Sequence, residues 1–273
     1  MKHSATALFE SSNVVVSGAC GPGVRTVVFL QGLGSEHQLW QLIIPVFEEH
    51  YGVILLDLPD RGVPNNDACC GPWPGPLDSY ADDLLGTMRE LALQNAVFVG
   101  HSAGALVGML AAVREPQRFA QMVLISPAPR FLNGAGHAGG CQQSDLNELL
   151  AAVEGNCYGW SGQALGLTDQ SERPELVLAL TNSFVRTNPE IARHFARAAF
   201  LSDARAELAF LAIPTLILQS AHDGVAPLAV GHYINEQLAN SRLVVVETQD
   251  HCPHLGAHQG TLAALHSFLL PAT

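Results

Sequence analysis

Short apolar runs rich in β-branched residues recur along the chain, with turn residues and helical patterns between them. Several runs are apolar at every position, which is typical of parallel strands covered on both faces. This alternation predicts an α/β fold with a mostly parallel, doubly wound sheet and helices on both faces. The predicted strands are Val14 to Val16, Val27 to Leu30, Val53 to Leu56, Ala96 to Val99, Met122 to Ile125, Thr215 to Leu218 and Leu243 to Val246.

Helical periodicity fills the intervals between these runs. The segment from Ala103 to Arg114 is small and apolar, and Pro116 stops it. The other predicted helices of the core are Ser79 to Leu93, Leu228 to Leu238 and Thr261 to Leu270.

One segment, residues 132–205, contains helical patterns without a convincing strand. It begins with a glycine-rich stretch from Asn133 to Gly140 that we expect to be flexible, and it carries helix starts at Thr168, Ser171 and Pro189. We expect residues 1–131 and 206–273 to form the core and residues 132–205 a helical lid. An insertion at this point lies above the carboxyl ends of the strands, where open α/β sheets bind ligands.

The sequence Gly-His-Ser-Ala-Gly from Gly100 to Gly104 stands between a predicted strand and a predicted helix. A serine on such a sharp turn adopts a strained backbone, and only small residues two positions away avoid a clash. The turn exposes the hydroxyl above the sheet, so Ser102 is the candidate nucleophile. The alternative is a glycine-serine turn without chemistry.

A serine hydroxyl needs a histidine to take its proton and an acid to orient that histidine. In this motif class the acid and then the histidine follow the serine along the chain. Asp223 follows the strand Thr215 to Leu218 in a tight turn, and His251 follows the last predicted strand. We therefore expect Ser102, Asp223 and His251 to act together.

Neighbouring residues offer alternatives to this assignment. His254 could replace His251 as the base, and Asp250 could replace Asp223 as the acid. His101 and His222 also lie next to the proposed serine and acid in the sequence. For both histidines a structural role is the simpler interpretation. A metal site of His251, His254 and His258 lacks an obvious acidic ligand, so no metal or other cofactor is predicted.

The loop after the strand Val27 to Leu30 reads Gln-Gly-Leu-Gly from Gln31 to Gly34. Its glycines let the backbone approach a substrate, so the amides of Leu33 and Ala103 are predicted to form an oxyanion hole.

Charge and composition exclude several kinds of partner. The formal net charge is −12 with only 13 Lys and Arg residues, which leaves no basic surface for nucleic acid or an anionic membrane. The start of the sequence lacks a signal-peptide pattern, so we expect a cytoplasmic protein. The six cysteines show no Cys-x-x-Cys pair and are interpreted as reduced thiols.

Five stretches carry a closer resemblance: Leu77 to Leu85, Phe98 to Leu110, Arg130 to Asn133, Phe200 to Arg205 and His251 to Leu255. They resemble the RsbQ-like α/β-hydrolases, which include a bacterial stress-signalling hydrolase and the plant strigolactone and karrikin receptors. The resemblance implies an eight-stranded sheet, a four-helix lid over an apolar pocket and the triad named above. It also implies the pocket residues Phe131, Cys141, Trp160, Ala164 and Ala199.

The plant receptors would be expected to carry phenylalanine at the positions of Leu33, Cys141 and Ala164. The lid looks more similar to the bacterial branch.

Two functions are consistent with the resemblance. One is hydrolysis of a small, largely apolar ester or lactone through an acyl-enzyme. The other is a signalling module that binds or slowly hydrolyses such a ligand and then engages a protein partner through its lid.

Overall fold

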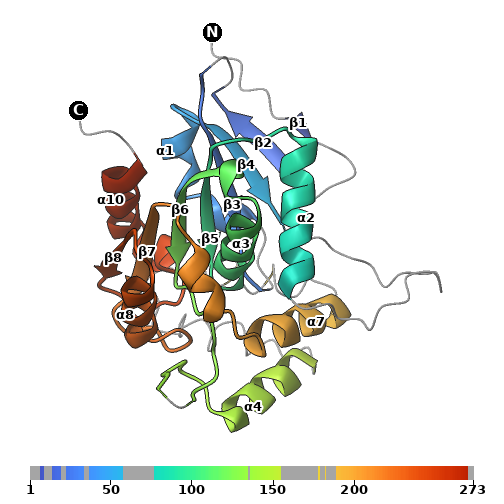
Figure 1. The fold of residues 1–273 in the computed structure, drawn as a ribbon, viewed down its shortest axis with the longest axis vertical. Helices are drawn as coiled ribbons and strands as arrows, with labels where there is room; N and C mark the ends of the chain where they lie inside the picture. The colour runs from blue at the N-terminus through green and yellow to red at the C-terminus, as the bar shows by residue number, and fades with distance from the viewer. Residues whose placement is uncertain are drawn as a thin grey trace, which may run out of the picture.

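The computed structural model describes residues 7–8, 14–19, 23–33, 37–57, 77–134, 136–154, 178, 182 and 189–269. An eight-stranded sheet in the order β1-β2-β4-β3-β5-β6-β7-β8 forms its centre (Figure 1). The strands are β1 (Ala7–Leu8), β2 (Val14–Gly18), β3 (Thr26–Leu30), β4 (Gly52–Leu56), β5 (Ala96–His101), β6 (Phe119–Ile125), β7 (Thr215–Ser220) and β8 (Ser241–Val246).

Strands β3 to β8 run parallel to one another, whereas β2 pairs antiparallel with both β1 and β4. All the strands predicted from the sequence are present, each with its boundaries moved by at most a few residues. The mostly parallel α/β fold class is therefore confirmed. The strand order changes direction between β3 and β5, which places the carboxyl end of β5 at the point where such sheets bind ligands.

Helices cover both faces of the sheet, so the central strands β3, β4, β5 and β7 are almost fully buried. Val28 and Leu30 of β3 pack into an apolar cluster with α2 (Leu77–Glu90), α3 (Ala103–Arg114) and α8 (Leu228–Gln237). Val27 and Phe29, which point the other way, pack with α1 (Ile44–Glu48) and α10 (His258–Leu269). This two-sided burial is the reason that the strands are apolar at nearly every position.

The helix predictions hold best where a local signal marks the end. Helix α3 has the predicted bounds, because Glu115 leaves the helical conformation ahead of Pro116. Helix α2 ends at Glu90, three residues before the predicted end, because the chain enters β5 through positive φ angles at Ala92 and Asn95. Among the described helices, none combines the length and apolarity that a membrane span requires.

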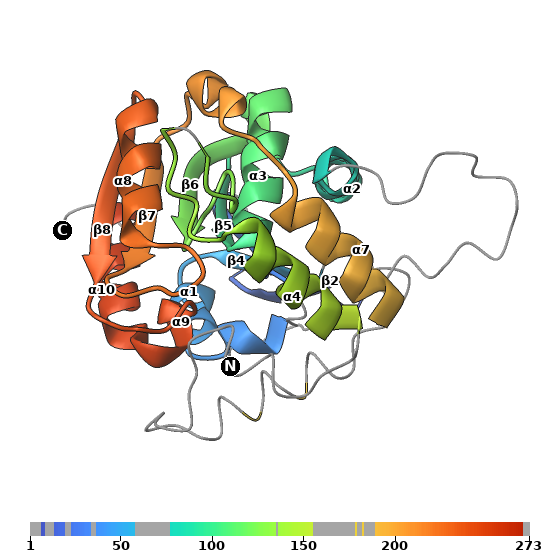
Figure 2. The same cartoon turned by 90° about the horizontal axis from the view of Figure 1, so that it is seen from below.

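Two helices of the predicted lid are described, α4 (Gln143–Glu154) and α7 (Pro189–Phe200). They lie side by side at the end of the sheet where the parallel strands finish (Figures 1 and 2). The glycine-rich stretch before α4 is closed by hydrogen bonds from Asn133 N to Cys141 O and between Gly134 and His137. The helix start at Pro189 is confirmed. Thr168 and Ser171 lie outside the described residues, so the four-helix lid stays a prediction.

Shorter helices connect these elements. They are η1 (His37–Trp40), η2 (Pro116–Arg118), η3 (Ala206–Phe210) and α9 (Pro253–Gly256).

Candidate active site

Ser102 stands on the turn between β5 and α3 with a φ of 52° and a ψ of −122°. An L-residue rarely adopts this conformation, and it persists only where the surroundings enforce it. A Cβ on Gly104 would lie 2.5 Å from the carbonyl oxygen of Gln31, and one on Gly100 would lie 2.7 Å from Cα of Ala105. The small residues that the motif requires are therefore the ones that let the turn close.

Asp223 lies in the turn after β7, where backbone amides hold its carboxylate. Oδ1 accepts hydrogen bonds from the amides of Val225 at 2.8 Å and Ala226 at 2.9 Å. The side-chain amide of Gln219 donates to Oδ2 at 3.3 Å. These bonds orient the carboxylate independently of its contact with His251.

His251 lies in the loop between β8 and α9 and joins the two other candidates. Its Nδ1 is 2.8 Å from Oδ2 of Asp223, and its Nε2 is 2.9 Å from Oγ of Ser102. Because a carboxylate only accepts, Nδ1 carries the proton and Nε2 is left to accept from the serine hydroxyl. The structure thus brings together the three residues that the sequence selected, in the hydrogen-bonding order that proton transfer requires.

Burial and charge act in opposite directions on Asp223. Burial raises the pKa of the carboxyl group, but the charge and hydrogen bond of His251 and the amides of Ala226 and Val225 outweigh it and leave the pKa below its usual value. The carboxylate therefore stays ionised beside the imidazole, where it can stabilise a positive charge.

The loop after β3 lies directly against the serine turn. A Cβ on Gly32 would be 3.1 Å from Cβ of Ser102, which is closer than ordinary van der Waals contact, so glycine at that position favours the close approach of this loop to the serine. Ala103 is the first residue of α3, and its amide has no partner within the helix. The loop after β3 and the start of α3 therefore both adjoin the serine turn, whereas the oxyanion hole formed by the amides of Leu33 and Ala103 stays a prediction.

The competing residues point elsewhere. His254 stacks on Trp40 with ring centroids 4.5 Å apart and accepts a hydrogen bond from the side-chain amide of Gln31 at 3.1 Å. Asp250 binds the hydroxyl of Thr248 at 3.0 Å. His222 pairs with Glu247 on the surface. None of these side chains makes a described contact with the serine hydroxyl.

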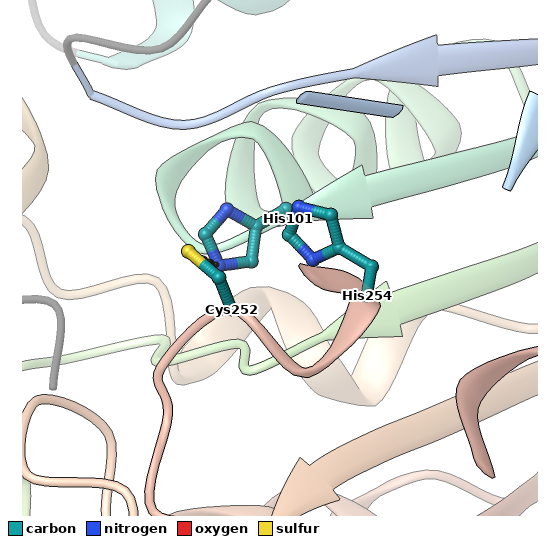
Figure 3. A group of neighbouring side chains, drawn as sticks. All are labelled: His101, Cys252 and His254. Atoms are coloured by element: carbon teal, nitrogen blue, oxygen red, sulfur yellow. Dashed lines mark hydrogen bonds between the residues drawn. The ribbon is translucent and has the colours of Figure 1, made fainter. Parts of the chain in front are cut away.

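His101, Cys252 and His254 form a buried group of neighbouring side chains (Figure 3). These residues, rather than His251, His254 and His258, are the described side chains spaced as metal ligands could be. However, Nε2 of His101 already bonds the carbonyl of His251, and burial raises the pKa of the Cys252 thiol, which disfavours a thiolate. This chemistry favours hydrogen bonding over metal binding.

Sequence reasoning did not predict the hydrogen bonds that His101 and Gln31 make. His101 ends β5, Gln31 follows β3, and both side chains are at most 1% exposed. A buried polar side chain needs a partner, and that requirement was the available signal.

A family model described as alpha/beta hydrolase fold matches residues 25–257 of the chain. The chain belongs to the alpha/beta hydrolase family.

Named relatives of this alpha/beta hydrolase cover nearly its whole length. Strigolactone esterase D14 of Arabidopsis thaliana is 32% identical over 92% of this chain and 93% of its own. Karrikin insensitive 2 receptor IA of Petunia hybrida is 30% identical over 94% and 95%. These matches confirm the predicted resemblance to the plant receptors, whereas the closer likeness to the bacterial branch stays a prediction.

A solved hydrolase from Oleispira antarctica superposes on this alpha/beta hydrolase with a TM-score of 0.85. Its sequence is 30% identical, and the match covers 96% of this chain and 95% of that one. The agreement extends the similarity from sequence to the course of the backbone.

The predicted pocket residues are only partly described. Phe131 is buried with its ring centroid 4.6 Å from that of Phe200, and Ala199 is buried on α7. Cys141 is half-buried, and burial followed by the charge of Asp145 raises the pKa of its thiol. Trp160 and Ala164 lie outside the described residues. The pocket assignment of this alpha/beta hydrolase therefore stays a prediction.

Proposed function

We propose that this alpha/beta hydrolase cleaves a small, largely apolar ester or lactone through an acyl-enzyme. The observation that carries the proposal is the chain of hydrogen bonds from Ser102 through His251 to Asp223. The name of the relative D14, a strigolactone esterase, supports an ester substrate.

In the first step Oγ of Ser102 attacks the carbonyl carbon, and the hydroxyl proton passes to Nε2 of His251. The electron pair of the carbonyl moves onto its oxygen, where the amides of Leu33 and Ala103 are the proposed donors. The carbon–oxygen single bond then breaks, and His251 returns the proton to the leaving alkoxide. For a lactone the alcohol so formed stays attached to the acyl group.

In the second step a water molecule gives a proton to His251 and attacks the acyl carbon. Collapse of this intermediate releases the acid and restores the serine hydroxyl. Asp223 stabilises the imidazolium in both steps because its carboxylate remains ionised. No metal or other cofactor takes part in this scheme.

We expect a compact, apolar substrate, because the described lid helices and the segment before them bury apolar side chains. Phe131, Phe195 and Ala199 are all buried in one apolar cluster together with Ala103. We assign the predicted pocket to this region, with residues 132–205 as its helical lid and the remainder of the chain as the core. The acidic net charge adds no attraction for an anionic substrate.

The test is the variant Ser102→Ala, assayed with p-nitrophenyl acetate and butyrate. We expect the rate to fall by at least roughly 10³-fold while the melting temperature stays within a few degrees, because one buried hydroxyl is lost without a cavity. Ser267→Ala, on the surface of α10, is the matched control and should keep full activity. Ester hydrolysis by Ser102→Ala at the wild-type rate would exclude this nucleophile.

The named similarity to a karrikin receptor favours a second candidate, a signalling module with slow turnover that engages a protein partner through its lid. The two functions differ in how long the acyl group or ligand stays bound. Rapid mixing with a p-nitrophenyl ester, followed by intact-protein mass spectrometry, separates them. A fast burst with an acyl-enzyme that persists for minutes favours signalling, whereas steady turnover without accumulation favours metabolism.

A further inference from the structure

We propose that His101 is a positioning residue, which donates a hydrogen bond from Nε2 to the carbonyl of His251 and so holds the base over Ser102. This inference rests on the proposed function, because it assigns His101 a purpose only if His251 is the base. The role differs from packing, which any side chain of similar volume could supply.

The hydrogen bond joins residues that are 150 positions apart in the chain, with 3.0 Å between Nε2 and the carbonyl oxygen. A carbonyl oxygen only accepts, so Nε2 of His101 must carry the proton. Residue 101 is joined by a peptide bond to Ser102, and the accepting carbonyl belongs to His251 itself. One hydrogen bond therefore couples the backbone of the nucleophile to the backbone of the base.

The loop that carries His251 is held at two consecutive carbonyl groups. The hydroxyl of Ser220, at the end of β7, donates to the carbonyl of Asp250 at 2.6 Å. His101, at the end of β5, bonds the next carbonyl along the chain. Hydrogen bonds from the ends of two strands restrict the path of this loop, and they therefore restrict the position of the His251 imidazole.

Water cannot replace this donor without rearrangement, since His101 and His251 are each only 1% exposed. The ring of His101 is also confined from the far side. Its centroid is 4.7 Å from that of His254 (Figure 3). His254 in turn stacks on Trp40. The donor is thus fixed in place, and its loss leaves a buried carbonyl without a partner.

A positively charged ring beneath the base would oppose protonation of His251. Burial, and then the nearby charge of His251, lower the pKa of His101 to about 3, so the ring is neutral at physiological pH. The hydrogen bond to His251 and the charge of Asp223 act in the opposite direction, and His254 and Cys252 are the other described titratable side chains in contact with the ring. His101 can therefore hold the carbonyl of His251 without electrostatic cost to proton transfer.

The test compares His101→Gln with His101→Met in the full-length protein. Glutamine places an amide nitrogen near the position of Nε2 and can still donate, whereas methionine has a similar volume and no donor. We expect His101→Met to lower kcat for p-nitrophenyl butyrate by roughly 10- to 100-fold, with KM within about threefold. His101→Gln should recover most of that loss and stay within about fivefold of wild type.

A purely structural role would not move the imidazole of His251 relative to Asp223. We therefore expect the low-field proton resonance of Nδ1 of His251 in wild type and His101→Gln, and its broadening or loss in His101→Met. Thermal melts establish that each variant is folded. If His101→Met does not fold, His101→Asn replaces it, because its amide is one methylene shorter and does not reach the carbonyl.

Equal kcat and an unchanged low-field proton in wild type and the donor-free variant would overturn the inference. Labelling with a fluorophosphonate separates this failure from failure of the proposed function. Wild type that is not labelled at Ser102 would contradict the triad itself. Labelling of wild type and His101→Met at the same rate would contradict only the positioning role.

Discussion

The two sides of the serine are built by different kinds of contact. Below it lies the floor, which we define as Gln31, His101, Asp223, His251 and His254, all buried and joined to neighbouring loops by hydrogen bonds. The roof, which we define as Phe131, α4 and α7, is the part of the molecule that we propose to cover the serine, and its described buried side chains are apolar.

This difference separates two tasks. Hydrogen bonds are directional, so the floor can hold a proton donor and its acceptor within a few tenths of an ångström. Apolar packing is not directional, so we expect the roof to tolerate changes of shape while the hydrogen bonds among Ser102, His251 and Asp223 keep their geometry. We expect substitutions in the floor to change rate and substitutions in the roof to change which ligand binds.

The largest effect on the rate is expected from Asp223→Asn, a substitution in the floor. The amide can donate to Nδ1 of His251, which favours the wrong tautomer, and it carries no charge to stabilise the imidazolium. Activity toward p-nitrophenyl butyrate should fall by roughly 10³- to 10⁴-fold with the fold intact. Asp250→Asn is the matched control, because that side chain binds Thr248, and its activity should stay within about threefold. A larger loss in Asp250→Asn than in Asp223→Asn would reverse the assignment of the acid.

His101 in the floor should also affect how the free energy of unfolding depends on pH. Burial and the charge of His251 lower the pKa of His101 to about 3, whereas the unfolded chain takes up this proton near pH 6.5. Between these values the unfolded state binds more protons, so the free energy of unfolding falls as pH falls. The loss attributable to His101 should be about 2 kcal/mol between pH 7 and pH 5.

Urea denaturation of wild type and His101→Gln at several pH values measures this contribution as a difference of slopes. The variant should lose less stability on acidification, by about 1 kcal/mol per pH unit below pH 6. His222→Gln removes an exposed histidine and should leave the slope unchanged. Parallel curves for wild type and His101→Gln would contradict a neutral, buried ring.

The smallest effect is expected in the roof, from Phe131→Leu. Loss of the ring that faces Phe200 should change the ratio of KM values for butyrate and acetate esters several-fold, with kcat for acetate within about twofold. Phe119→Leu is the matched control at the start of β6, where the ring faces Phe98. Phe119→Leu should lower the melting temperature without changing the ratio of KM values. If Phe131→Leu changed kcat as much as Asp223→Asn does, the distinction between floor and roof would be contradicted.

The sequence by itself determined the strands, α3 and the serine turn. Each depends on neighbours in the chain: continuous apolar runs, Pro116 after α3, and Gly100 and Gly104 on either side of Ser102. Local sterics and local hydrophobic pattern are encoded within a few residues, so they can be read without knowing the fold.

Only the tertiary structure decided which of several neighbouring polar residues faces the serine. His251 and His254 are three positions apart, yet one reaches Oγ of Ser102 and the other stacks on Trp40. The bond from His101 to the carbonyl of His251 likewise depends on strand ends far apart in the chain. The direction of a side chain in a loop is set by the path of the loop and by its distant contacts, and local patterns do not carry that information.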